Sequence, residues 1–276
     1  MIYDQTRCTL GEGPLWHPDR KELFWFDIGQ KALHSKAQNW RFRGHVSAAG
    51  WIDCDTLLIA SETALLSFDI PSGEHTLLCQ LDANNPVTRS NDGRTDPWGG
   101  FWIGTMGKNA EANAGAIYRY YRGELRRLYA PLTIPNAICF SPDAGHGYFA
   151  DTVQRKIWRQ ALSQTDGWPT GAPEVFVDLG KDGLNPDGAV CDTAGNLWNA
   201  QWGAARVACY RPDGQFDHAI ALPTDHITCP AFGGSDLRTL FVTSATQDLA
   251  GTQIDAGKTF ALEVETPGQK EHQVVL

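Results

Sequence analysis

A short pattern recurs six times along this chain of 276 residues and limits the fold more than any other feature. Each copy has a small or polar residue, a short apolar stretch, a turn rich in Asp and Gly, and then an aromatic or apolar segment such as ELFWFD, GFWIGTM or NLWNAQW. The turns centre on residues that are 34 to 49 positions apart: Asp19, Asp53, Asp96, Asp143, Asp192 and Ser235. A period of about 40–50 residues containing several strands is typical of propeller blades.

The segments between these copies favour an all-β chain. A second set of strand-like segments follows the first (ALLSFD, AIYRYY, KIWRQA, RVACYR), and no amphipathic helix of 12 residues or more is found. Six blades of four antiparallel strands fit the length, so we predict one six-bladed β-propeller domain over residues 1–276. Since the ring must close, we expect the segment Met1–Asp4 to add a strand beside Thr259–Glu265.

Composition excludes several classes of protein. The net charge is −9 and no basic run of five residues occurs, which argues against binding nucleic acid. No apolar stretch approaches the ~18 residues of a membrane helix, and the first residues do not resemble a signal peptide. Seven cysteines occur without a C-x-x-C pair, and Cys139 and Cys191 alternate with other residues in strand-like segments. This pattern predicts buried free thiols and a cytoplasmic protein. A closed propeller buries its own edges, so we expect a monomer.

Within the repeat, oxygen-bearing side chains occupy similar places. Glu12 and Asn136 each stand 12 residues before an aromatic strand residue, whereas Asn91 and Asp187 stand 11 residues before one. The two weaker copies have Ser47 and Cys229 at the same position of the repeat. The innermost strands of a propeller line its channel, so we expect these six residues to form a ring near the axis.

Such a ring favours a cation in the channel. Two carboxylates with one or two amide oxygens suit a hard divalent ion such as calcium, magnesium or manganese, and zinc also accepts carboxylates. Taken singly, Asn91-Asp92-Gly93 and Pro186-Asp187-Gly188 are ordinary turn sequences. Their repetition favours a shared site, and a purely structural calcium ion remains an alternative.

Four segments carry a resemblance to a known family: LGEGPLW, RSNDGRTDPWGGFWIGTM, IPNAICFSPD and NPDGAVCDTAGNLWNAQW. They resemble the regucalcin (senescence marker protein), gluconolactonase and luciferin-regenerating-enzyme family, from Leu10 to about Phe260. The resemblance implies a six-bladed propeller with one catalytic divalent metal in its channel. The metal could be Zn, Ca, Mn, Mg or Fe(II).

The resemblance also implies roles for individual residues. Glu12, Asn136 and Asp187 correspond to the metal ligands of the family, and Arg89 and Asn91 correspond to substrate contacts. Many members have an acidic residue soon after the G-T-M run, where this chain has Asn109. Lys108 and Glu111 lie near enough in sequence to act in its place, so the sugar preference is left open here.

Hydrolysis of a lactone needs a polarised carbonyl, an activated water and a stabilised oxyanion, which a metal and a base together supply. Asp187 is the candidate general base; the alternative is that Asp187 only binds the metal, which then activates the water itself. The predicted function is metal-dependent hydrolysis of a sugar lactone to its aldonic acid, with a small-molecule lactone as the partner. The alternatives are an aryl-esterase or organophosphate hydrolase on the same propeller, and a non-catalytic calcium-binding or interaction propeller.

Other patterns indicate no competing chemistry. The eight histidines show no H-E-x-x-H spacing, and no G-x-S-x-G nucleophile elbow occurs. Cys229 has no placed histidine and is expected to pack in the core. His226 precedes the strand near Cys229 and could face the mouth of the site, although a surface role is expected. The tryptophans are expected to pack between blades, although one at the mouth of the channel could stack on a sugar face.

Overall fold

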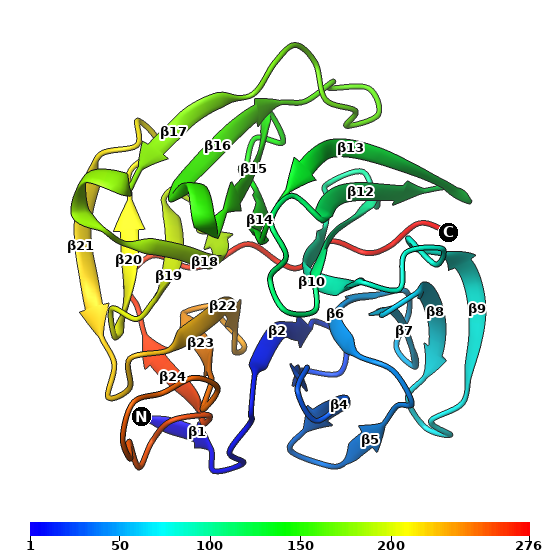
Figure 1. Ribbon diagram of the computed structural model, residues 1–276, viewed down its shortest axis with the longest axis horizontal. Helices are drawn as coiled ribbons and strands as arrows, with labels where there is room; N and C mark the ends of the chain where they lie inside the picture. Colours follow the sequence, from blue (N-terminus) through cyan, green and yellow to red (C-terminus); the bar gives the residue numbers. More distant parts are fainter.

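The computed structural model describes all 276 residues, which form a ring of six β-sheets (Figure 1). Every sheet has four strands in antiparallel order, and the first strand of each repeat lies nearest the centre of the ring. The predicted all-β, six-bladed propeller is therefore confirmed. The structure contains no helix long and apolar enough to cross a membrane.

Blades 1 to 3 follow one another along the chain, each built from the axis outward. Blade 1 contains β2 (Gly11–His17), β3 (Glu22–Asp27), β4 (Ala32–Ser35) and β5 (Asn39–Arg41). Blade 2 contains β6 (Val46–Trp51), β7 (Thr56–Ser61), β8 (Ala64–Asp69) and β9 (His75–Gln80). Blade 3 contains β10 (Thr88–Thr95), β11 (Phe101–Gly107), β12 (Gly115–Tyr121) and β13 (Glu124–Leu132).

Blades 4 to 6 continue the same order, with two single-turn 3-10 helices, η1 (Thr152–Gln154) and η2 (Gly180–Asp182). Blade 4 contains β14 (Pro135–Phe140), β15 (His146–Asp151), β16 (Lys156–Ala161) and β17 (Glu174–Asp178). Blade 5 contains β18 (Asn185–Cys191), β19 (Leu197–Trp202), β20 (Arg206–Tyr210) and β21 (Phe216–Ala221). Blade 6 contains β22 (Ile227–Gly233), β23 (Thr239–Ser244), β24 (Thr259–Glu263) and β1 (Ile2–Asp4).

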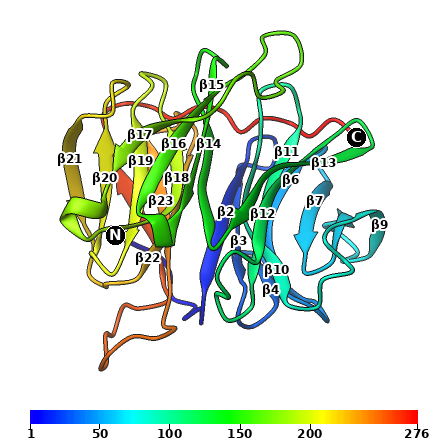
Figure 2. The ribbon, with the colours of Figure 1, turned by 45° about the horizontal axis from the view of Figure 1, so that its top comes forward.

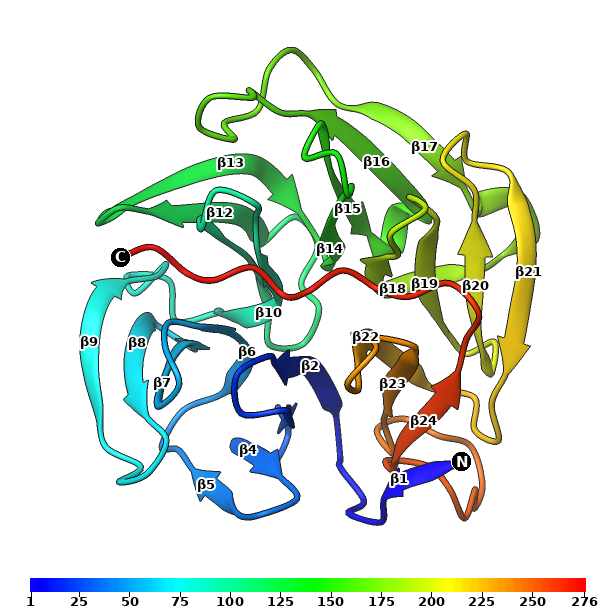
Figure 3. The same ribbon diagram turned by 180° about the vertical axis from the view of Figure 1, so that it is seen from behind.

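The ring closes through a blade that both ends of the chain share. β1 pairs with β24 in antiparallel register, with Ile2 opposite Phe260 and Asp4 opposite Thr259 (Figure 3). This confirms the predicted pairing of the N-terminal segment with the last strand. Closure of this kind joins residues far apart in sequence, so the ring cannot open without losing these hydrogen bonds.

The hydrophobic core is divided among the boundaries between blades. Six clusters of buried apolar side chains each join two neighbouring blades. Because both faces of a blade are covered, its strands carry apolar residues on both faces instead of alternating with polar ones. Trp25, Trp102 and Trp198 are buried in this way, as predicted. All seven cysteines are free, and Cys139 and Cys191 are buried.

The last residues of the chain, 266–276, cross one end of the channel, and we call them the C-terminal strap (red in Figure 3). The strap forms backbone hydrogen bonds to three blades: Gly268 N–H to Leu237 O, Val274 N–H to Trp51 O and Val275 N–H to Gly99 O. These acceptors lie in or beside the turns between the first two strands of their blades. The strap therefore covers the channel at that end, a feature that the sequence did not predict.

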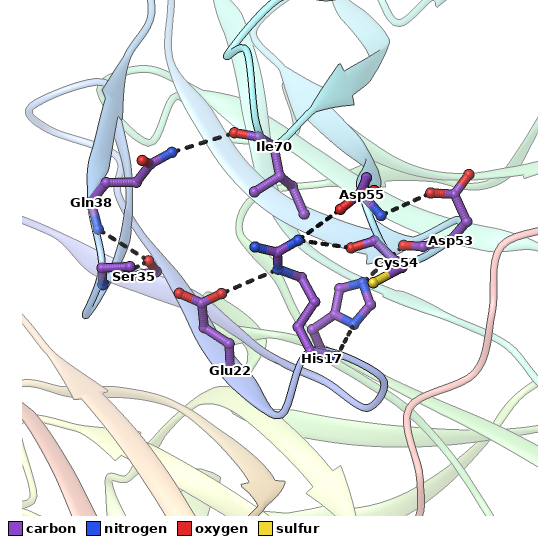
Figure 4. Close-up of polar contacts among 10 residues, drawn as sticks. His17, Glu22, Ser35, Gln38, Asp53, Cys54, Asp55 and Ile70 are labelled. Carbon is purple, nitrogen blue, oxygen red and sulfur yellow. Dashed lines mark hydrogen bonds and ion pairs between the residues drawn. The ribbon is translucent and has the colours of Figure 1, made fainter.

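His17 is a structural residue at the boundary between blades 1 and 2 (Figure 4). Its Nε2 lies 2.9 Å from Asp53 O, and its Nδ1 lies 3.3 Å from the backbone N of Arg20. Arg20 also donates to Glu22, Cys54 O and Asp55. These contacts tie the first hairpin of blade 1 to the first turn of blade 2, so His17 belongs to the scaffold.

Candidate functional site

Every innermost strand has a shift in register of the β-bulge type at its channel-facing residue. Glu12 pairs with Phe26 and Leu15 with Phe24, which leaves two residues of β2 without partners. β14 likewise has two residues without partners after Asn136. Shifts at the equivalent level occur in the other four inner strands, β6, β10, β18 and β22. A bulge redirects a side chain relative to the regular alternation of a strand. This local irregularity explains how a residue of the inner strand can face the channel.

The pairing register corrects the predicted equivalence by one residue. Glu12 and Asn136 are the last paired residues before the shift, whereas Asn91 and Asp187 are the next residue along, inside it. The aromatic residues used for the spacing also differ in register: Phe24 and Tyr148 lie two residues before the partner of the last paired residue, whereas Trp102 and Trp198 lie three residues before it. Both ends of the 11-residue spacing are therefore shifted. All four side chains nevertheless reach the same space.

That space is a cavity of about 570 Å³ at the end of the channel opposite the strap. Its lining includes all six predicted site residues: Glu12, Arg89, Asn91, Asn109, Asn136 and Asp187. The volume lies in the range that holds a small ligand. Ser47 and Cys229, the two weaker members of the predicted ring, are buried beside the channel but do not line the cavity.

A chain of hydrogen bonds links the polar residues on one side of the cavity. Arg89 Nη1 donates to Asn91 Oδ1 at 2.9 Å, and Asn91 Nδ2 donates to Asn136 Oδ1 at 2.9 Å. Asn136 Nδ2 in turn donates to Thr152 Oγ1 at 2.9 Å, and Thr152 donates to Pro186 O at 2.7 Å. The chain ends at the backbone beside Asp187. It fixes the amide of Asn136 with its oxygen toward the other site residues.

The two carboxylates of the site lack a cationic hydrogen-bond partner. Glu12 and Asp187 are 6 % and 5 % exposed, and neither forms an ion pair, although Glu12 accepts the backbone N–H of Gly13 at 3.1 Å. Burial, and then the charge of Asp92, raise the pKa of Glu12 to about 8. Burial and the charges of Glu12 and Asp92 also raise the pKa of Asp187 well above its usual range. The protein alone leaves this negative charge poorly compensated.

Arg89 is a positive charge that acts on both carboxylates, and it is also poorly compensated. Burial lowers the pKa of Arg89 to about 10 despite the attraction of Glu12 and Asp187. Its only protein hydrogen bonds are to Ser90 O and Asn91 Oδ1, both from Nη1. The rest of the guanidinium can therefore donate to a ligand in the cavity.

This donor set fits a divalent cation. Glu12 and Asp187 supply carboxylate oxygens, Asn136 supplies an amide oxygen, and none of the three is neutralised by a side-chain cation. Two buried carboxylates that repel each other are unfavourable without a counter-charge. The remaining coordination positions could be filled by water or by a ligand in the cavity.

Asn109 differs from the other predicted residues because it lies on an exposed loop at the mouth. Its backbone N–H and its Nδ2 both donate to Glu111 at 3.0 Å. Lys108 also lines the cavity and forms an ion pair with Glu62, which accepts a hydrogen bond from His45 as well. Glu111 does not line the cavity. This edge of the mouth thus presents an amide and an ammonium group in place of a carboxylate.

The alternative candidates have structural surroundings. Burial raises the pKa of the Cys229 thiol well above its usual range, and its sulfur packs against Gly188. Cys209, Asp217 and His218 lie close together on blade 5, but Asp217 is already paired with Arg211. His226 is half-buried and stacks on Trp202, a residue that lines the cavity. Of the two positions considered for His226, the structure supports the one beside the mouth of the site.

Sequence reasoning missed two polar residues that hold the site together. Thr152 follows the strand β15 and orients Asn136, and buried Asn199 donates to the carbonyl oxygens of Asp187 and Gly188. Asn199 interrupts the aromatic segment NLWNAQW, which was a visible signal of a polar residue inside a strand. Thr152 carried no comparable signal.

Comparisons with known proteins agree with the fold. The profile described as "SMP-30/Gluconolactonase/LRE-like region" matches residues 10–246. A protein of Rhizobium meliloti (strain 1021) named "Putative sugar lactone lactonase" is 42% identical, over 97% of this chain and 94% of its own length. The L-arabinolactonase of Azospirillum brasilense is 35% identical, over 95% of this chain and 91% of its own. The crystal structure of a calcium-binding protein, regucalcin, from Agrobacterium tumefaciens is 39% identical with a TM-score of 0.97, covering 100% of this chain and 97% of that one.

Proposed function

Because this chain belongs to the SMP-30/gluconolactonase/LRE-like family, we propose that it hydrolyses a sugar lactone to the aldonic acid with the help of one divalent metal ion. Glu12, Asn136 and Asp187 would hold the metal. The observation that carries this proposal is the pair of buried, unpaired carboxylates beside an oriented amide oxygen at a ligand-sized cavity. The lactonases among the relatives support the reaction class.

In this reaction, water adds to the ester carbonyl, the bond from the acyl carbon to the ring oxygen breaks, and that oxygen leaves as a hydroxyl group. A divalent cation, when bound, polarises a carbonyl and stabilises negative charge on its oxygen. Asp187 would take the proton from the attacking water. Arg89 and Asn91 would hold hydroxyl groups of the sugar by hydrogen bonds, and Asn109 and Lys108 would contact the substrate end nearest the mouth.

The cysteines and the chemistry of the substrate indicate the compartment and the reaction that precedes this one. Seven free cysteines suit a reducing compartment such as the cytoplasm. The substrate of a lactonase is the cyclic ester that arises when a sugar is oxidised at its anomeric carbon. The partner reaction upstream is therefore an oxidation of that kind. We propose that the protein works as a monomer on this small molecule.

The first experiment is a pH-indicator assay of acid release from a panel of aldonolactones. It uses metal-stripped protein with Zn²⁺, Ca²⁺, Mn²⁺, Mg²⁺ or Fe²⁺ added back. We expect turnover only with metal, while circular dichroism shows the same strand content with and without it. Hydrolysis at full rate in the metal-free protein would disprove the metal requirement. If no lactone reacts with any metal, aryl esters and organophosphates become the next substrates to test.

Two variants test the proposed roles in the same assay. Asp187→Asn keeps the size of the side chain and is expected to lower kcat by about 10²–10⁴. Thr152→Val removes the hydrogen bonds to Asn136 and Pro186 and is expected to weaken metal binding about tenfold or more. Thr152→Ser, which retains the hydroxyl, is the control and should bind metal like the wild type. Equal metal affinity in the Val and Ser variants would contradict the positioning role.

A further inference from the structure

One wall of the cavity is aromatic. Trp202, the last residue of β19, is half-buried and lines the cavity together with Asp187 and Gln247. The chain has ten tryptophans, but Trp202 is the only aromatic residue among those that line this cavity. The structure thus singles out one tryptophan at the mouth, where the sequence could not choose among them.

The Trp202 ring is held in place from several sides. His226 stacks on it, with 3.9 Å between ring centroids and 18° between the ring planes. The Nδ1–H of His226 donates to Gln247 O at 2.9 Å, which fixes the histidine ring in turn. Trp202 also packs against the small apolar cluster of Leu10, Ile28 and Ala245. A ring held in this way loses little freedom when a ligand lies against it.

The indole also has an unused polar group. The Nε1–H groups of Trp51, Trp98, Trp102 and Trp198 each donate to an acceptor within the protein. Trp202 Nε1 donates to no protein group, and it is not sealed from solvent. A tryptophan that presents an apolar ring and a free N–H to a polar cavity is suited to a ligand with both C–H and hydroxyl groups.

We propose that Trp202 is a specificity-determining residue whose ring lies against the C–H groups of a cyclic, polyhydroxylated ester, with Nε1–H donating to one of its hydroxyl groups. His226 is a positioning residue that keeps the indole at this angle. This inference rests on the proposed lactonase function. It adds that the site recognises the sugar ring itself, so that it favours a sugar lactone over a linear or aryl ester.

The test compares Trp202→Ala and Trp202→Phe with the wild type in the metal-loaded enzyme, using glucono-1,5-lactone and an aryl acetate. Trp202→Ala is expected to raise KM for the lactone about tenfold with little change in kcat. Trp202→Phe should raise KM much less than Trp202→Ala does, because phenylalanine restores the flat apolar surface. KM for the aryl acetate should change less than KM for the lactone.

The control is Trp158→Ala, since Trp158 is also half-buried and stacks on another ring, that of Phe149, but does not line the cavity. It should lower thermal stability and leave KM unchanged. His226→Ala should raise KM in the same direction as Trp202→Ala, whereas His226→Phe, which keeps a stacking ring, should not.

The outcomes separate this inference from the function on which it rests. A wild type that hydrolyses the lactone, with the same KM in Trp202→Ala and Trp158→Ala, would overturn the role of Trp202 and leave the lactonase proposal standing. An equal rise in KM for the lactone in Trp202→Ala and Trp202→Phe, with unchanged melting temperature, would overturn the stacking role. If the metal-loaded wild type hydrolyses no lactone, both proposals fail together.

Discussion

Asp96 and Asp187 are both buried acidic residues of this propeller, but their partners differ. Asp96 accepts hydrogen bonds from the backbone N–H groups of Trp98 and Gly100, from Trp102 Nε1 and from Arg119 Nε at 2.6 Å. No side chain donates to Asp187. At the scale of the residue, a full set of donors marks an aspartate of the scaffold, whereas a buried aspartate without them marks the candidate site.

His17 gives the scaffold a defined response to pH. Its Nδ1 accepts the Arg20 N–H, so the other ring nitrogen carries the proton and donates to Asp53 O. Burial lowers the pKa of His17 below its ordinary value of 6.5. The neutral ring of His17 therefore stabilises the folded protein fully above pH 6.5, where the histidine of the unfolded chain is neutral too. This stabilisation is lost as the pH falls below 6.5.

We therefore predict that His17→Gln weakens the loss of melting temperature on acidification from about pH 8 to about pH 5. Glutamine can keep both hydrogen bonds but does not titrate. Melting curves followed by circular dichroism at several pH values measure the effect. The exposed His75 serves as the control, and His75→Gln should follow the wild type. A His17→Gln profile that coincides with that of the wild type would contradict the argument.

At the scale of the element, the inner strands combine a bulge with close contact to their neighbours. A Cβ on Gly13 would lie 2.2 Å from Ser47 O, and one on Gly188 would lie 2.3 Å from the sulfur of Cys229. Both glycines follow a proposed metal ligand directly. The inner strands thus approach one another closely at the site, and only glycine fits between a ligand and the next blade.

Gly188→Ala is expected to destabilise the protein by about 1–3 kcal/mol through overpacking, and to lower activity by displacing Asp187. The free energy of unfolding in urea and the lactone assay measure the two effects. Gly44→Ala is the matched control, because its added Cβ meets atoms of Glu62 only at 3.5 Å. That variant should stay within about 0.5 kcal/mol of the wild type. A Gly188→Ala protein with wild-type stability and activity would show that the strands can separate at no cost.

At the scale of the whole molecule, the ring is held by the pairing of β1 with β24 in blade 6 and by the strap that crosses one end of the channel (red in Figure 2). Beneath the site, Glu271 of the strap forms a buried ion pair with Arg94 of β10. Arg94 also attracts Asp92, whose pKa burial raises to about 6. The strap therefore supplies the carboxylate that balances a positive charge in the channel.

Removing only one partner of this pair should be costly. Glu271→Ala leaves the Arg94 guanidinium buried and unpaired, and is expected to destabilise the protein by about 3–5 kcal/mol. The double variant Arg94→Met with Glu271→Met removes both charges and should lose less stability than the single variant. Urea unfolding of the two variants measures the difference. If the single variant proved as stable as the double variant, Glu271 would not be needed to balance the buried charge of Arg94.

The sequence by itself determined the architecture and indicated part of the candidate site. The repeat of turns and aromatic strands predicted six four-stranded blades and their closure, because blade packing demands apolar residues on both strand faces at a regular period. The same register placed Glu12, Asn91, Asn136 and Asp187 at one level, and the structure brings them to one cavity. Local pattern sufficed here, since every blade repeats the same path from the axis outward.

Tertiary structure alone decided what surrounds those residues. Thr152, Trp202 and the strap reach the channel from positions that the repeat does not distinguish, and the Arg94–Glu271 pair joins residues 177 apart in sequence. The one-residue offset between blades 1 and 3 also depends on where each ladder shifts register. Such contacts follow from how the six blades close into a ring. Only the folded ring decides which side chains of different blades meet.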